Sequence, residues 1–156
     1  MAVGLPASSA SADVMNGWDT IVNFNSYLCL EVADWRKDNG APVRQWGCTN
    51  GANQKWWATP VANESASWIF NRNADVSASY KCLEIADWSK ANGAPARMFD
   101  CTGGANQKWV YMPYGSTYRW KNVHSGKCLE IADWGTGYGG QARQWECTNG
   151  ANQSWL

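Results

Sequence analysis

Hydrophobic and polar residues alternate over short runs in this chain, and no stretch of useful length shows the 3.6-residue spacing of a helix. The run Cys-Leu-Glu-Val/Ile alternates between two faces and predicts a short strand at residues 29–32, 82–85 and 128–131. Turn-forming pairs such as Asn39-Gly40 follow, and they precede a second predicted strand at 44–48, 97–101 and 143–147. The pattern therefore predicts an all-β chain.

These runs belong to an internal repeat. Three ungapped copies of 28 residues occupy 29–56, 82–109 and 128–155, and fifteen positions are identical in all three. A strand leading into each copy is predicted at 21–23, 69–71 and 120–122, and the second connector carries an insertion at 73–80. About four short strands in each of three units predict a threefold-symmetric barrel, because closure removes open sheet edges.

Length and charge exclude several classes of function. A chain of 156 residues suits one domain with a real core. Lys+Arg and Asp+Glu both number 13, so no basic surface is available for nucleic acid. No apolar run reaches the roughly 18 residues of a membrane-spanning helix, so no membrane insertion is expected.

Six cysteines form three pairs, each 19 positions apart. The repeat favours one disulfide within each unit, although a cyclic exchange between units would also respect the symmetry. Zinc is disfavoured because the Cys-x2-Cys spacing is missing and His124 is the single histidine, so no metal or cofactor is expected. Disulfides indicate an oxidising compartment and a secreted protein. The expected pairs are Cys29–Cys48, Cys82–Cys101 and Cys128–Cys147.

The first 17 residues are small and polar without a pattern. Ala10-Ser11-Ala12 has the small-x-small form of a signal-peptide cleavage site, but no basic segment and no full apolar segment precede it. We expect residues 1–17 to be a signal-peptide remnant or a disordered tail, and 18–156 to be the folded domain.

The pattern Cys-Leu-acid, Cys and Gln-x-Trp resembles the ricin-B-type lectins, the family 13 carbohydrate-binding modules. The resemblance covers about residues 18 to 156, and Gln-x-Trp occurs three times, at 54–56, 107–109 and 153–155. It implies a β-trefoil and carbohydrate binding at up to three sites, for galactose-type or xylan/arabinan-type glycans. The tryptophans of the three motifs, Trp56, Trp109 and Trp155, are expected in the core.

Register arithmetic brings a carboxylate and an aromatic ring together in each repeat. If Cys29 faces Cys48 in an antiparallel pair, Glu31 lies opposite Trp46. Such a pair suits a sugar, because the ring packs on the C–H face and the carboxylate accepts hydroxyls. The other two repeats place Glu84 opposite Phe99 and Glu130 opposite Trp145.

The resemblance implies sugar contacts from the acid after Cys-Leu, the aromatic residue two before the second cysteine, and the Asn-Gln pair. These residues are Glu31, Trp46, Asn53, Gln54, Glu84, Phe99, Asn106, Gln107, Glu130, Trp145, Asn152 and Gln153. The acid is usually Asp in the family, so the Asp three residues on could supply the carboxylate instead, or could make an Asx-type turn. An arginine stands where the family often has a polar hydrogen-bonding residue. These additional candidates are Asp34, Asp87, Asp133, Arg44, Arg97 and Arg143.

Threefold repetition favours binding over catalysis. An acid–base mechanism needs one asymmetric arrangement, whereas here each carboxylate recurs in a near-identical setting and His124 is unique. We therefore expect a carbohydrate-binding protein that is not an enzyme. The alternative is a protein-binding module, such as a protease inhibitor on the same fold, acting through the insertion at 73–80.

Overall fold

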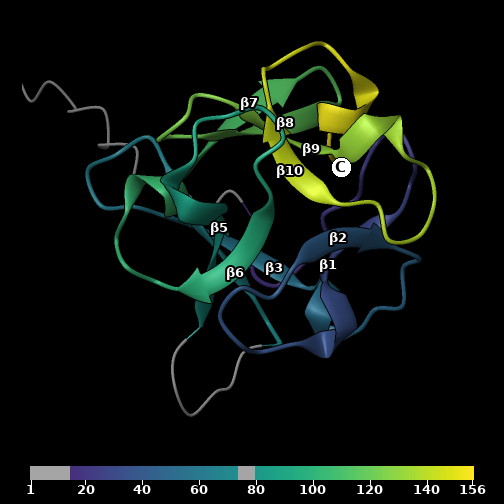
Figure 1. The fold of residues 1–156 in the computed structure, drawn as a ribbon, viewed down its shortest axis with the longest axis horizontal. Helices are drawn as coiled ribbons and strands as arrows, with labels where there is room; N and C mark the ends of the chain where they lie inside the picture. The colour runs from purple at the N-terminus through teal and green to yellow at the C-terminus, as the bar shows by residue number, and fades with distance from the viewer. Residues whose placement is uncertain (1–14, 74–79) are drawn as a thin grey trace, which may run out of the picture.

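The computed structural model describes residues 15–73 and 80–156 and consists of short strands and 3-10 turns (Figure 1). The strands are β1 (Cys29–Val32), β2 (Val43–Trp46), β3 (Trp56–Pro60), β4 (Ser67–Asn71), β5 (Lys81–Ile85), β6 (Ala96–Asp100), β7 (Trp109–Tyr114), β8 (Thr117–Asn122), β9 (Cys128–Ile131) and β10 (Ala142–Trp145). The turns are η1 (Ala33–Trp35), η2 (Ala52–Gln54), η3 (Ala86–Trp88), η4 (Ala105–Gln107), η5 (Ala132–Trp134) and η6 (Ala151–Gln153). The predicted all-β class is confirmed.

Each repeat contributes one antiparallel hairpin, namely β1–β2, β5–β6 and β9–β10. Figure 1 shows these three hairpins arranged around the centre of the molecule. The pairs β3–β4 and β7–β8 connect each repeat to the next, and the bridges Asp19↔Trp56 and Asn23↔Trp155 tie in the segment before β1. This near-closed, threefold arrangement is the predicted β-trefoil.

The core is built around the three Gln-x-Trp tryptophans, as predicted. Trp56, Trp109 and Trp155 are fully buried among Leu, Ile and Val side chains from the hairpins. Each indole Nε1 donates to the carbonyl of the leucine after the first cysteine, at 2.8, 2.9 and 3.2 Å for Leu30, Leu83 and Leu129. The buried indole therefore has its one polar group satisfied, and it links the end of a repeat to its own first strand.

The disulfides join the two cysteines within each repeat, as the repeat favoured. Their Cα–Cα distances are 5.2, 5.1 and 5.0 Å for Cys29–Cys48, Cys82–Cys101 and Cys128–Cys147. Each closes a loop of about 20 residues, which stabilises the fold by roughly 3 kcal/mol in the chain-entropy model.

The predicted strand register is wrong by two residues. Cys29 pairs with Trp46, not with Cys48, and Glu31 pairs with Arg44. The same shift pairs Glu84 with Arg97 and Glu130 with Arg143. The physical reason is that a disulfide needs only a short Cα separation, which Cys48 reaches from beyond the end of β2 without standing opposite Cys29. A shift of two preserves parity, so Glu31 keeps the predicted face but not its predicted neighbour.

One further expectation needs adjustment. The leading strands at 69–71 and 120–122 lie within β4 and β8, whereas 21–23 forms only isolated bridges. Met15 belongs to the buried core cluster, and the domain boundary at residue 18 stays a prediction. Residues 1–14 of the expected leader and 74–79 of the insertion lie outside the described residues.

A core tryptophan and an exposed one provide a matched test of this packing. Trp109→Phe removes the donor to the buried Leu83 carbonyl and leaves a cavity, so the free energy of unfolding should fall by about 2–4 kcal/mol. Trp88→Phe, at a side chain that is 51% exposed, keeps an aromatic ring beside Gly104 and should lower it by about 1 kcal/mol or less. Urea titration followed by far-UV circular dichroism measures both, and equal losses would contradict the assignment of Trp109 to the core.

Candidate functional site

A buried carboxylate lies on the first strand of each repeat, that is on β1, β5 and β9. Glu31 is 4% exposed, and its Oε2 accepts a hydrogen bond from Arg44 Nε at 2.9 Å. Its Oε1 accepts from Gln54 Nε2 at 3.1 Å and from Asn53 Nδ2 at 3.3 Å. Both oxygens are therefore occupied inside the protein. The same contacts are made by Glu84 and Glu130.

The Asn-Gln pair braces the loop between the second cysteine and the core tryptophan. Gln54 Oε1 accepts the Thr49 N–H at 2.8 Å, and its Nε2 also donates to the Gly47 carbonyl at 2.9 Å. Asn53 Nδ2 also donates to the Val32 carbonyl at 3.1 Å. Because Asn53 and Gln54 are buried, these bonds satisfy polar groups that would otherwise destabilise the fold.

The arginine on the second strand joins the buried carboxylate to the surface. Besides its bond to Glu31, Arg44 contacts Asp34 Oδ1 through its terminal nitrogen at 3.4 Å. Its guanidinium lies over the Trp46 ring, 4.4 Å from the centroid. The planar guanidinium is suited to stacking and ion pairing at once. The corresponding stacks are Arg97 on Phe99 at 5.0 Å and Arg143 on Trp145 at 4.6 Å.

An Asp-Trp pair in left-handed backbone conformation forms the outer part of each site. Asp34 and Trp35 both have φ of 55°, and the two other pairs lie between 54° and 59°. This region is unfavourable for residues with a side chain, at a cost of roughly 1–2 kcal/mol per residue, and such strain clusters at functional sites. The Asp34 side chain is 74% exposed, and Trp35 is 53% exposed. The strained turn thus presents a carboxylate and an indole to solvent in all three repeats.

A glycine allows the exposed indole to lie against the loop between the second cysteine and the core tryptophan, which we call the brace loop (residues 48–56, 101–109 and 147–155). A Cβ on Gly51 would come within 2.7 Å of the Trp35 ring, so the close approach requires glycine at this position. Gly104 and Gly150 stand in the same relation to Trp88 and Trp134. The indole is therefore positioned, although half of its surface is open.

In the third repeat these elements enclose a shallow pocket of about 270 Å³. Trp134 and Trp145 contribute rings, Arg143 and Asp133 contribute charges, and Glu130 lies behind Arg143. The remaining lining residues are Thr148 and Asn152. A pocket of this size, with aromatic surface and a few convergent polar groups, suits a small polar ligand.

The structure brings the sequence-predicted site residues together in every repeat, but in two layers. The Glu, Asn and Gln form a buried network, whereas the Asp and aromatic side chains are accessible. The exposed tryptophan next to the aspartate also walls the pocket, and the threonine after the second cysteine lines it. Sequence reasoning missed the threonine, although it is identical in all three copies, which is the signal that could have identified it.

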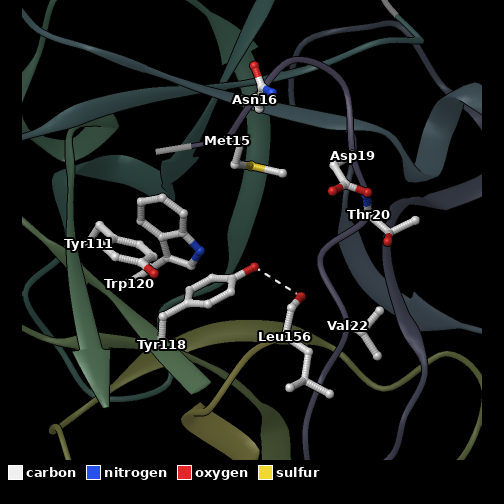
Figure 2. Close-up of a pocket in the computed structure, with 9 residues that line it drawn as sticks. All are labelled: Met15, Asn16, Asp19, Thr20, Val22, Tyr111, Tyr118, Trp120 and Leu156. Atoms are coloured by element: carbon white, nitrogen blue, oxygen red, sulfur yellow. Dashed lines mark hydrogen bonds between the residues drawn. The ribbon is translucent and has the colours of Figure 1, made fainter. Parts of the chain in front are cut away.

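A second pocket, of about 400 Å³, lies away from the repeated sites between the β7–β8 hairpin and the segment before β1 (Figure 2). Tyr111, Tyr118 and Trp120 form an aromatic cluster on one side, with ring centroids 5.1 to 5.7 Å apart. The Tyr118 hydroxyl donates to the Leu156 carbonyl at 3.1 Å, and burial raises the pKa of Tyr118 well above its ordinary value. All of its lining residues lie outside the three 28-residue copies. Its other lining residues are Met15, Asn16, Asp19, Thr20 and Val22.

The unique histidine lies beside the second site. His124 packs its ring edge against Trp88, with centroids 4.9 Å apart, and its Nε2 is 3.0 Å from the Trp88 carbonyl. Within 15–73 and 80–156, no three His, Cys, Asp or Glu side chains gather where they could hold a metal ion. Among the same residues, no helix is long and apolar enough to cross a membrane.

The fold and the threefold recurrence of the site residues define a β-trefoil of the lectin type. The family model for the ricin-type β-trefoil lectin domain matches residues 17–155, so the chain belongs to that family. The predicted resemblance is therefore confirmed, and carbohydrate binding is the function class that the family supports.

Solved structures and one curated protein are similar to this chain. The designed threefold-symmetric protein ThreeFoil is 28% identical, with a TM-score of 0.83 over 90% of this chain and 96% of its own. An exo-β-1,3-galactanase from Clostridium thermocellum is 30% identical, also with a TM-score of 0.83, over 92% of this chain and 30% of the enzyme. Serine protease 1 of Rarobacter faecitabidus is 42% identical over 43 residues, which are 28% of this chain and 8% of the protease. Each match thus covers less than a third of the enzyme.

The two carboxylates of one repeat should differ sharply in their effect on stability. Glu31→Gln keeps the shape but removes the charge that balances partly buried Arg44, so the free energy of unfolding should fall by about 1–3 kcal/mol. Asp34→Asn, at an exposed ion pair, should cost less than about 0.5 kcal/mol. Urea unfolding of the two variants tests this contrast, and a larger loss for Asp34→Asn would show that the network is assigned to the wrong acid.

Proposed function

We propose that this chain is a secreted carbohydrate-binding domain with three glycan sites, one in each repeat, and no catalytic role. The observation that carries the proposal is the threefold recurrence of an exposed Asp-Trp pair above a stacked arginine and aromatic ring. Each pair lies in a strained turn that places a hydrogen-bonding carboxylate beside an open indole face. These are the two features that a pyranose uses, a rim of hydroxyls and a C–H face.

The exposed aspartate is the better candidate for the sugar carboxylate. Glu31 already accepts three hydrogen bonds inside the protein and has little contact with solvent. Asp34 is 74% exposed, and within residues 15–73 and 80–156 its ion-pair partner is Arg44 at 3.4 Å, so its lone pairs can receive hydroxyls. In this proposal Glu31 positions Arg44, and Arg44 supplies donors at the base of the pocket.

The charge of each site favours neutral glycans. At the site itself, one glutamate, one aspartate and one arginine sum to a net charge of about minus one, which disfavours acidic sugars. Neutral galactose-type and xylan- or arabinan-type glycans both fit this constraint. The similarity to a galactanase structure makes β-1,3-galactan a reasonable first polysaccharide to test.

Repetition and disulfides support the remaining parts of the proposal. Three weak sites gain avidity on a polysaccharide, whereas catalysis gains nothing from a triplicated carboxylate. Three disulfides suit an oxidising, extracellular setting. The protease-inhibitor alternative would act through the insertion at 73–80, most of which lies outside the described residues.

Removing the exposed carboxylates should abolish glycan binding without unfolding the protein. The triple variant Asp34→Asn, Asp87→Asn, Asp133→Asn loses a charge-assisted acceptor at each site, so the affinity of each site should fall about tenfold or more. A glycan array with galactans, xylans and arabinans, followed by calorimetric titration of the best ligand, measures the loss. Unchanged binding would exclude these aspartates as the sugar carboxylates, and the absence of any glycan signal from the unmodified chain would overturn the proposed function.

The second site should be the weakest of the three. Phe99 offers a single ring where Trp46 and Trp145 offer two, a difference of about 0.5–1 kcal/mol in stacking and burial, or roughly two- to fivefold in affinity. Gly103 also replaces the asparagine found at residues 50 and 149 and loosens the brace loop. Titration of Trp46→Ala, Phe99→Ala and Trp145→Ala with one monosaccharide tests the order first, third, second. Equal losses for Phe99→Ala and Trp46→Ala would reject it.

A further inference from the structure

The loop between the two strands of each repeat contacts the site of the following repeat. The Gly40 N–H donates to the Met98 carbonyl, and the Gly139 N–H donates to the Gln45 carbonyl, each at 2.8 Å. Gly93 makes the equivalent bond to Gln144. The loop of the third repeat therefore lies against the second strand of the first repeat, next to Trp46.

In two of the three loops, the residue before that glycine is an asparagine that hydrogen-bonds to an acidic residue of the following repeat. Asn39 donates to the Asp100 carboxylate and accepts the Asp100 N–H, both at 2.9 Å, at the edge of the second site. Asn92 accepts the Glu146 N–H at 2.9 Å at the edge of the third site. The second and third sites are thus bordered by an asparagine and an acid.

The first site departs from this pattern. Tyr138 replaces the asparagine, and Gly47 replaces the acid. A Cβ on Gly47 would overlap the Tyr138 hydroxyl, so the tyrosine occupies the space that a side chain at residue 47 would need. The Tyr138 ring lies 5.0 Å from the Trp46 ring and is tilted by 43°, and the side chain is 64% exposed. The first site therefore has a second aromatic surface continuous with Trp46.

The loop that carries Tyr138 is held in place from the first repeat. Buried Gln45 donates from Nε2 to the carbonyls of Gly135 and Gly137, both at 2.9 Å. The Gly139 N–H bond to Gln45 closes the other side of the tyrosine. Because the backbone on both sides of Tyr138 is bonded to the strand of the first site, binding a ligand there requires little ordering of the loop.

We infer that Tyr138 forms an additional subsite that makes the first site selective for a neutral oligosaccharide of two or more units, whereas the other two sites recognise one unit. This inference rests on the proposed carbohydrate function. One sugar unit lies at the Asp34 and Trp46 site, and the next unit packs its C–H face on Tyr138. At the other two sites, the corresponding position is polar and carries Asp100 or Glu146, which offers no ring for a second unit.

The test uses the full chain, labelled with nitrogen-15, and follows the indole N–H signals of Trp46 and Trp145 as separate reporters of the first and third sites. The probes are D-galactose with β-1,3-galactobiose, and D-xylose with xylobiose. At Trp46 the disaccharide should bind about 2- to 10-fold more tightly than its monosaccharide, the range that one aromatic contact supplies. At Trp145 the affinities for the monosaccharide and the disaccharide should agree within the error of the titration.

Two variants distinguish a subsite from a general effect. Tyr138→Asn, which installs the residue found at Asn39 and Asn92, should reduce the disaccharide preference at Trp46 to that at Trp145. Tyr114→Asn, at another exposed tyrosine on β7, is the matched control and should retain the preference. The double variant Asn92→Tyr, Glu146→Gly should transfer the preference to the third site.

An equal disaccharide preference in the unmodified chain and in Tyr138→Asn overturns the inference, as does equal binding of the mono- and disaccharide at Trp46. In both cases the sugar-dependent shifts still support the proposed function. Silence of both indole signals with all four sugars overturns the proposed function together with the inference.

Discussion

The buried ion pair between Glu31 and Arg44, with its two counterparts, is the interaction on which the sites depend. The carboxylate receives donors from the second strand and from the Asn-Gln turn, so it connects the hairpin to the loop that leads to the core tryptophan. A buried carboxylate is costly unless it is paired and hydrogen-bonded, and here Arg44 donates to one oxygen while Asn53 and Gln54 donate to the other. Because the Arg44 Nε is held by Glu31, the face of the guanidinium can stack on Trp46 and one of its terminal nitrogens can contact Asp34.

This arrangement separates support from recognition. The glutamate, asparagine and glutamine are buried and hydrogen-bonded to one another, and they position groups that are accessible. The aspartate and the tryptophan after it remain open because their left-handed turn projects them beyond the hairpin. Strain of this kind persists only where the surroundings hold it, and the contact of Trp35 with the Gly51 backbone provides that hold.

The threefold symmetry also makes departures from it informative. A site that is built three times has two internal references, so each substitution can be compared with its counterparts in the same molecule. Phe99 changes one ring, whereas Tyr138 and Gly47 change together, with one side chain occupying the space vacated by the other. A compensated pair of this type preserves the packing and alters the surface that a ligand meets.

The sequence by itself determined the class of the fold and the core tryptophans, and it favoured one disulfide within each repeat. Alternation, repeat length and Gln-x-Trp are local signals, and three copies of each signal left few arrangements that close a core. The tertiary structure alone decided which acid is accessible, because burial depends on how the hairpin packs against the brace loop. It also decided the register, since a disulfide restricts a distance and not an opposite position: Cys48 reaches Cys29 from beyond β2 while Trp46 stands across from it. Contacts between repeats, such as Tyr138 against Trp46, join residues 92 positions apart and follow only from the closure of the trefoil.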